Sequence, residues 1–225
     1  MPVLLAGLCL GLTLPGFAGG VVANCTEADL HGALAGGGVV TFGCEGTIAL
    51  ANTIAITNDT FLDGSGRAVV ISGNNAVRVF MVNTGVTFTV VNLAIVDGRT
   101  NAGAGIFNAG GLLELVSVRF TNNQAVANDP LGGYSGVAQG GAIFNARGVV
   151  NATNCVFDHS QAISSPPDIA AGGAIHNEGG AVNLVGTILS SNRCVGGDGV
   201  PYALEYGRRT GCASSGGGVF NVAWR

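Results

Sequence analysis

The chain has 225 residues, of which 39 are glycine and only 10% are charged. Glycine is therefore more than twice as frequent as in an ordinary globular domain, and charge is less than half as frequent. Nine arginines, no lysine and a net charge of −4 without a basic cluster argue against a nucleic-acid-binding surface. The glycines follow no three-residue period, which excludes collagen, and the many aliphatic residues exclude a disordered chain.

Residues 1–18 have the composition of a secretory signal peptide. They are almost wholly apolar, a Pro-Gly pair breaks the helix near their end, and small residues occupy the positions that precede a cut after Ala18. We therefore expect a mature domain of residues 19–225 without a membrane span, secreted or held at the cell surface. An uncleaved anchor is the alternative, because no charged residue precedes Glu27.

An N-terminal cap is expected at about residues 24–38. Thr26-Glu27-Ala28-Asp29 resembles a capping box that opens a short helix, and Gly36-Gly37-Gly38 would end it. Such a helix covers the open end of the core in proteins built from stacked repeats. Because Cys25 and Cys44 are close in the sequence of a chain with an export signal, we predict a disulfide bond between them.

The rest of the chain carries a repeat that insertions of variable length interrupt. In each repeat an asparagine ends a segment such as Gly141-Ala142-Ile143-Phe144-Asn145, and mostly apolar residues follow at positions 5, 7, 10 and 12 after it. Apolar pairs two residues apart predict short strands with one buried face, and the three-residue step between the pairs predicts a corner. The expected asparagine column contains Asn83, Asn108, Asn145, Asn177 and Asn221.

These repeats predict an all-β fold, a parallel β-helix in which each strand pairs with strands of the repeats before and after it. The asparagine side chains would form a hydrogen-bonded ladder inside a turn. Cys155 falls in a column with Leu93 and Val118, so we expect a buried free thiol. No cap is recognisable at the C-terminal end: either the chain is a fragment or something covers this end, and end-to-end association would do so.

Short motifs carry a resemblance to known proteins. Gly140-Gly141-Ala142-Ile143 and Gly172-Gly173-Ala174-Ile175, together with Phe120-Thr121-Asn122-Asn123, resemble the GGA[ILV] and FxxN repeats of polymorphic outer membrane proteins and related right-handed parallel β-helix proteins. Residues 24–98 are similar to the N-terminal region of bacterial secreted β-helix repeat proteins. The resemblance implies a right-handed β-helix and an adhesin-like role.

The same fold class contains pectate lyases and polygalacturonases, and Phe61-Leu62-Asp63-Gly64-Ser65-Gly66 is similar to a structural turn found in both. Those lyases use an arginine or lysine base, often beside calcium-binding carboxylates, and the hydrolases use clustered aspartates. The chain has no lysine, no Arg-x-Pro-x-x-Arg motif, no Asp-Asp pair and no Asn-Thr-Asp motif. We therefore expect no catalytic residues, metal or cofactor. A polysaccharide lyase or hydrolase is the alternative function, and a structural repeat module or fragment is the second alternative.

The constant spacing within the repeats forces the variable segments, 96–104, 121–140, 158–172 and 190–216, onto one side. Loops on a rigid scaffold are the usual place for binding, and all the tyrosines lie in these segments. The predicted function is therefore non-catalytic binding of a polysaccharide or a surface protein. The candidate ligand-binding residues are Tyr134, Tyr202, Glu205, Tyr206, Arg208 and Arg209.

Two further expectations concern these segments. A disulfide bond between Cys194 and Cys212 would close the longest segment and order its side chains. Asp158-His159 is a local acid–base pair, but because it occurs only once we interpret it as two surface residues.

Overall fold

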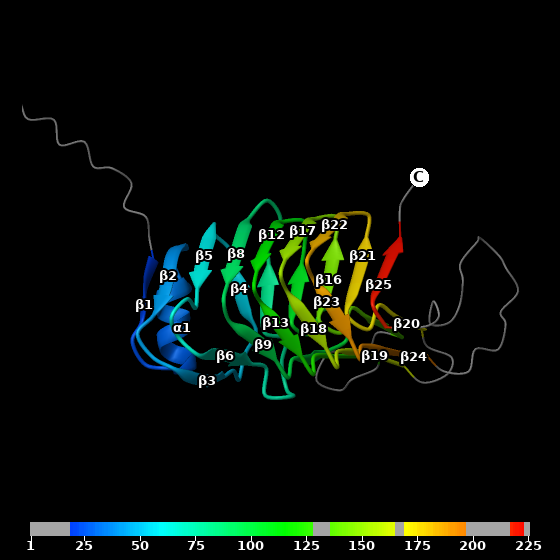
Figure 1. Cartoon of the computed structure of the whole chain (residues 1–225), viewed down its shortest axis with the longest axis horizontal. Helices are drawn as coiled ribbons and strands as arrows, with labels where there is room; N and C mark the ends of the chain where they lie inside the picture. Colours follow the sequence, from blue (N-terminus) through cyan, green and yellow to red (C-terminus); the bar gives the residue numbers. More distant parts are fainter. Residues whose placement is uncertain (1–18, 128–135, 165–168, 197–216, 223–225) are drawn as a thin grey trace, which may run out of the picture.

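The computed structural model describes residues 19–127, 136–164, 169–196 and 217–222. These residues form an all-β structure of parallel strands with one short helix, and the repeats stack along the long axis of the molecule (Figure 1). The arrangement is compatible with the expected parallel β-helix. The expected signal peptide, residues 1–18, lies outside the described part of the chain.

The expected helix lies at the N-terminal end of the stack (Figure 1). The described chain begins with β1 (Gly19–Val22), continues into α1 (Glu27–Leu34) and returns in β2 (Gly38–Phe42), which pairs with β1 in parallel. The predicted disulfide bond joins Cys25, just before the helix, to Cys44, just after β2. The bond therefore ties the start of the helix to the end of β2.

The helix α1 begins at an N-cap and buries one side. The hydroxyl of Thr26 accepts a hydrogen bond from the backbone N–H of Asp29 at 3.2 Å, which satisfies one of the free donors of the first turn. Leu30 and Leu34 are buried and belong to the main core. Within the part of the chain that the structure describes, this helix falls short of the length and apolarity needed to cross a membrane.

Three long sheets of parallel strands, here called sheets 1, 2 and 3, carry the repeats within the described residues. Sheet 1 contains β1, β2, β5 (Thr60–Asp63), β8 (Thr87–Val91), β12 (Leu112–Val116), β17 (Val149–Thr153) and β22 (Ala181–Val185). Sheet 2 contains β3 (Gly46–Ala49), β6 (Val69–Ser72), β9 (Ala94–Val96), β13 (Arg119–Thr121), β18 (Val156–Asp158) and β23 (Ile188–Ser190). Sheet 3 contains β4 (Ile54–Ile56), β7 (Phe80–Val82), β11 (Ile106–Asn108), β16 (Ile143–Ala146), β21 (Ile175–Glu178) and β25 (Val219–Val222).

Two smaller parallel sheets lie within the variable segments. Sheet 4 contains β10 (Arg99–Thr100), β14 (Gln124–Val126), β19 (Gln161–Ile163) and β24 (Arg193–Val195). Sheet 5 contains β15 (Val137–Gln139) and β20 (Ile169–Ala171). From β8 onward the chain visits sheets 1, 2, 4 and 3 in turn, passing through sheet 5 in the two repeats that contain it. The sequence predicts loops here, so these strands are a correction: part of each variable segment is ordered by pairing with a neighbouring repeat.

The strand register confirms the predicted inward columns. Leu113 of β12 pairs with Phe88 on one side and Val150 on the other, and all are fully buried. In sheet 2, Phe120 pairs with Phe157, and their rings stack with centroids 4.7 Å apart. Large side chains of successive repeats therefore lie directly over one another and form one continuous core.

Cys155 is buried in the core, as predicted. It follows the corner between sheets 1 and 2, in line with Leu93 and Val118 of the preceding repeats, which are buried as well. The thiol makes no disulfide bond and lies 3.6 Å from the carbonyl oxygen of Leu115. Burial raises the pKa of the Cys155 thiol, so it stays protonated and unreactive in the folded chain.

Four of the expected asparagines form a continuous ladder on sheet 3. The side-chain Nδ2 of Asn108 donates to Oδ1 of Asn145 at 2.8 Å, Asn145 donates to Asn177 at 2.6 Å, and Asn177 donates to Asn221 at 2.6 Å. Each of the first three also donates to the carbonyl oxygen three residues further along its own turn, at 2.8–2.9 Å. One amide group thus closes a turn and joins it to the next repeat.

Asn83 does not belong to the ladder, and its inclusion in the column is wrong. The register pairs Asn108 with Val82, so Asn83 lies one residue beyond the strand β7. The turn from this paired position to Phe88 is one residue longer than the turn from Asn108 to Leu113. Five residues before Phe88 is Asn83, but the residue that pairs with Asn108 is Val82, six residues before Phe88. The constant spacing of five residues therefore does not hold in this turn.

Burial is lower in the described C-terminal repeat. Val182, Leu184 and Leu189 hold core positions but are only partly buried, whereas Val150 and Phe157 in the preceding repeat are fully buried. Among the described residues, β22, β23 and β24 are the terminal strands of their sheets. The expected end-to-end association at this end stays a prediction.

Candidate functional site

The predicted ligand-binding residues lie outside the described residues. Tyr134 belongs to segment 128–135, and the other five belong to segment 197–216. Cys212 also lies in that segment, so its predicted disulfide bond with Cys194 stays a prediction. What the structure describes is the scaffold on which these segments begin and end.

The three undescribed internal segments start side by side. The strands β14, β19 and β24 are hydrogen-bonded neighbours in sheet 4, and within one residue of their ends they lead into segments 128–135, 165–168 and 197–216 respectively. Neighbouring strands lie about 4.8 Å apart, so the first and third starting points are only about 10 Å apart. Sheet 4 therefore gathers the segments at one place on the molecule.

A small second core supports sheet 4. It consists of alanine methyl groups from sheet 4, Ala125 and Ala162, and from sheet 5, Ala138 and Ala170, with Cys194 packed against them. Small side chains let the two sheets approach closely, so even strands of two or three residues are held in place. The sequence signal for sheet 4 is the recurrence of Gln-Ala-Val and Gln-Ala-Ile near the start of two variable segments.

The corners that follow β13, β18 and β23 lead from sheet 2 into sheet 4 over four residues. The first residue ends a sheet-2 strand, the second has a positive φ, the third points inward and the fourth begins a sheet-4 strand. The positive φ values are 56° at Asn122, 52° at His159 and 53° at Ser191, in a backbone region where asparagine and histidine are enriched. We call the outward side chains of these corners the polar corner: Thr121, Asn122, Gln124, Asp158, His159, Gln161, Ser190, Ser191 and Arg193.

The inward residue of each corner fixes it to the preceding repeat. Asn123 accepts a hydrogen bond from the backbone N–H of Gly98 at 2.9 Å and donates to the carbonyl of Ile95 at 3.0 Å. Asn192 makes the same pair of bonds to the repeat of Ser160, at 3.0 and 2.8 Å. These bonds give the FxxN pattern its physical meaning: the aromatic or aliphatic residue fills the core, and the asparagine bonds the corner beneath.

Ser160 occupies this inward position in the second of these three corners and lacks the amide group. It is fully buried, and its hydroxyl has no hydrogen-bond partner among the described residues. Asn123 and Asn192 each make two hydrogen bonds to the preceding repeat, and the hydroxyl of Ser160 makes none with the described residues. The corner of Asp158 and His159 is therefore less firmly fixed to the repeat before it.

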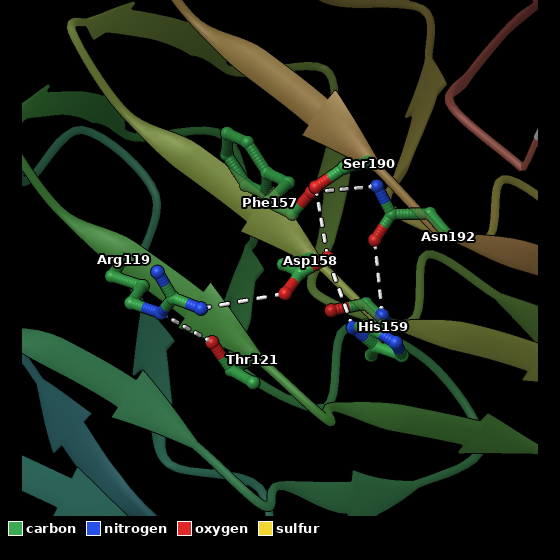
Figure 2. A network of polar contacts seen from close by, with 8 residues as sticks. Arg119, Thr121, Phe157, Asp158, His159, Ser190 and Asn192 are labelled. Carbon is green, nitrogen blue, oxygen red and sulfur yellow. Dashed lines mark hydrogen bonds and ion pairs between the residues drawn. The ribbon is translucent and has the colours of Figure 1, made fainter.

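Asp158 is the centre of a polar network on the outside of the same corner (Figure 2). Its Oδ1 accepts a hydrogen bond from the hydroxyl of Ser190 at 2.8 Å and lies 2.9 Å from Nδ1 of His159. Its Oδ2 lies 3.3 Å from Nη2 of Arg119, whose Nε donates to Thr121 at 3.0 Å. The bond from Ser190 and then that from His159 hold the pKa of Asp158 below its usual value.

The hydrogen bonds at Asp158 determine its protonation state. A carboxyl group with a lowered pKa is ionised at neutral pH and does not serve as a general acid. The hydroxyl of Ser190 donates its hydrogen bond to this carboxylate, and the imidazole of His159 lies against the same oxygen. In the described ranges, no three His, Cys, Asp or Glu side chains lie close enough to hold a metal ion.

A second titratable group lies on the outer side of sheet 3, where sequence reasoning did not look for one. The rings of Phe107, Phe144, His176 and Phe220 stack in succession, with centroids 4.9–5.1 Å apart, and the guanidinium of Arg78 lies 5.0 Å above the first ring. Burial of His176, which is 2% exposed, lowers its pKa to about 4. The imidazole is neutral at pH 7 and closed off from solvent, so it supports the stack rather than meeting a ligand.

Comparison with known proteins adds no relative. No protein-family model matches the chain, and no curated protein and no solved structure matches it. We therefore infer the function from the geometry of the polar corner and of the segments that begin beside it.

Proposed function

We propose that the chain is a right-handed parallel β-helix protein, secreted or held at the cell surface, that binds a glycan or a protein without catalysis. The observation that carries the proposal is the position of the variable segments. Segments 128–135, 165–168 and 197–216 leave from adjacent strands of sheet 4, directly beside the polar corner. A rigid sheet that presents several loops at one place is the usual architecture of a binding surface.

The chemistry of the polar corner supports this proposal. Its outward positions carry hydroxyl, amide, imidazole and guanidinium groups, which are the hydrogen-bonding partners that sugars and peptide groups need. The adjacent undescribed segments add the tyrosines and the Arg208-Arg209 pair, and tyrosine combines large contact area with a polar tip. The ionised carboxylate of Asp158, which pairs with Arg119, adds a hydrogen-bond acceptor.

The disulfide bond supports the proposed location. A bond between Cys25 and Cys44 is typical of proteins that fold in an oxidising compartment, and it agrees with the expected signal peptide. N-terminal sequencing of the exported protein tests this part of the proposal. A first residue of Gly19 is the expected result, and a chain that keeps Met1 and stays in the membrane fraction would favour an anchor.

Binding is tested with labelled mature protein on a glycan array and on immobilised cell-surface proteins. Tyr202→Ala and Arg208→Ala should each weaken binding to the selected ligand by about fivefold or more, because a truncated contact residue costs about 1 kcal/mol or more. Thr47→Ala, on the outer side of β3 at the far end of the stack, is the matched control and should leave the affinity unchanged.

Two results would contradict the proposal. One is a variant with residues 197–210 replaced by a Gly-Ser linker that folds and binds with unchanged affinity. The other is release of unsaturated or reducing ends from a polysaccharide panel, with or without calcium, because that would show a lyase or a hydrolase.

A further inference from the structure

The outer face of sheet 1 exposes an unusual share of the apolar side chains. Seven large apolar side chains are exposed among the described residues, and five of them point outward from this one sheet, with exposed fractions between 39% and 62%. Parallel sheets are normally covered on both faces. The five residues are Val21, Val39, Phe61, Val116 and Val185.

Charged groups are scarce on the same face. Its outward positions carry no arginine, and its carboxylates are Asp63 and Glu114. The Oε1 of Glu114 accepts a hydrogen bond from Asn151 at 2.7 Å, and Asn183 donates to Asn151 at 2.8 Å. The remaining outward positions are mainly valine and threonine. Depletion of charge, with apolar and neutral polar groups in similar numbers, is the composition of a protein–protein interface.

We propose that this face is a homodimer interface, in which the outer face of sheet 1 packs against the same face of a second copy. The seven strands lie side by side from β1 to β22 in one continuous surface (Figure 1). Its columns of side chains repeat at the strand spacing, so the pleated surface that matches it is another copy of itself. A two-fold axis makes such a contact self-complementary and closed.

The size of the face sets the expected strength of the dimer. Seven strands about 4.8 Å apart, each about five residues long, form a face of about 30 by 15 Å. Two copies would therefore bury on the order of 1,000 Å² in total, at the lower limit for a specific interface. The dimer should accordingly be transient, with a dissociation constant in the micromolar range.

Sedimentation of the mature chain, residues 19–225, over about 1–300 μM tests the proposal. The wild type should shift from monomer to dimer, and Val116→Glu should raise the dissociation constant at least tenfold, because it places a charge in the interface. Ile188→Glu is the matched control: Ile188 is 59% exposed but points outward from sheet 2, and its change should leave the dimer intact.

A second probe covers the case in which Val116→Glu reduces folding. Thr89→Lys places a charge on the central strand β8, at an outward position that does not enter the core, and it should also abolish the dimer. A chain that stays monomeric at 300 μM would overturn the proposal. So would a dimer that Ile188→Glu disrupts but Val116→Glu and Thr89→Lys do not, or binding of this face to phosphatidylcholine vesicles in place of self-association.

Discussion

Buried polar side chains decide how well each corner of the repeat is fixed. Asn123 and Asn192 each bind two backbone groups of the preceding repeat, and a buried donor or acceptor without a partner costs about 1–3 kcal/mol. Ser160 holds the same column with a hydroxyl that has no partner among the described residues. His176 is the other buried group with an unpartnered atom there, its Nδ1. Substitution of either residue should change the free energy of unfolding.

Ser160→Asn should stabilise the protein. The new amide is placed to accept from the backbone N–H of Asn123 and to donate to the carbonyl of Phe120, which repeats the bonding seen one corner earlier. We expect the free energy of unfolding to rise by about 1 kcal/mol, the net contribution of such bonds. Urea denaturation measures it, with Ser160→Ala as the control that removes the hydroxyl without adding the bonds. A loss of stability in Ser160→Asn would show that the corner has no room for the amide.

His176 should make the protein sensitive to acid. Its pKa falls to about 4 in the folded chain because of burial, against about 6.5 when unfolded, so protonation favours the unfolded state. The associated stability is complete above pH 6.5 and is lost as the pH falls towards 4, by about 2–3 kcal/mol. Glu178 shares the outer face of β21 with it, while Phe144, Phe220 and Gln139 surround the ring with uncharged groups.

The variant His176→Phe isolates this effect, because phenylalanine fills the same column in the neighbouring repeats. Denaturation curves at pH 7 and pH 4.5 should show a smaller loss of stability for the variant than for the wild type. Equal losses in both proteins would mean that other groups, not His176, govern acid unfolding.

At the scale of elements, the ladder on sheet 3 joins the strands β11, β16, β21 and β25. Asn145→Ala breaks the bonds to both neighbours and removes one of the acceptors of the Asn108 amide, so the free energy of unfolding should fall by about 2–4 kcal/mol. Asn83→Ala is the matched control, because Asn83 lies outside the ladder, and it should cost less than about 1 kcal/mol. Thermal melts of the two variants compare them. Similar losses would contradict the register described for β7 and β11.

Sequence periodicity was sufficient for the elements whose pattern is local. The N-cap at Thr26, the columns of Phe120 and Phe157, and the ladder from Asn108 onward follow from residue types at fixed spacing. The strands of sheets 4 and 5 do not, since segments of two or three residues such as Gln124–Val126 gain their order from pairing with a distant repeat. Asn83 was misplaced because a turn of one extra residue leaves the strand pattern intact and shifts only the turn.

The candidate site was predicted less well than the fold. The sequence directed attention to aromatic and charged residues of the insertions, which lie outside the described residues. It gave the pair of Asp158 and His159 little weight, because the partners that complete the network, Ser190 and Arg119, come from other repeats. Ser190 and Arg119 lie 32 and 39 positions from Asp158 in the sequence, so no local motif indicates these contacts.

At the scale of the whole molecule, different sides of the stack have different chemistry. The outer face of sheet 1 is nearly free of charge and rich in exposed valine, while the corner between sheets 2 and 4 is polar and adjoins the variable segments. The two surfaces lie on different sheets, so self-association through sheet 1 would leave the polar corner available for a ligand. A dimer would present two copies of the proposed binding surface and strengthen attachment to a repetitive ligand by avidity.

Hydrogen–deuterium exchange with and without the ligand selected on the array tests the proposed binding surface most directly. The account predicts slower exchange on ligand binding in residues 121–126, 158–163 and 190–195, which form the polar corner and sheet 4, and in the segments that follow them. Exchange in β8 and β12 of sheet 1 should not respond to the ligand. Ligand-dependent protection confined to sheet 1, or no protection in the three corners, would contradict the account.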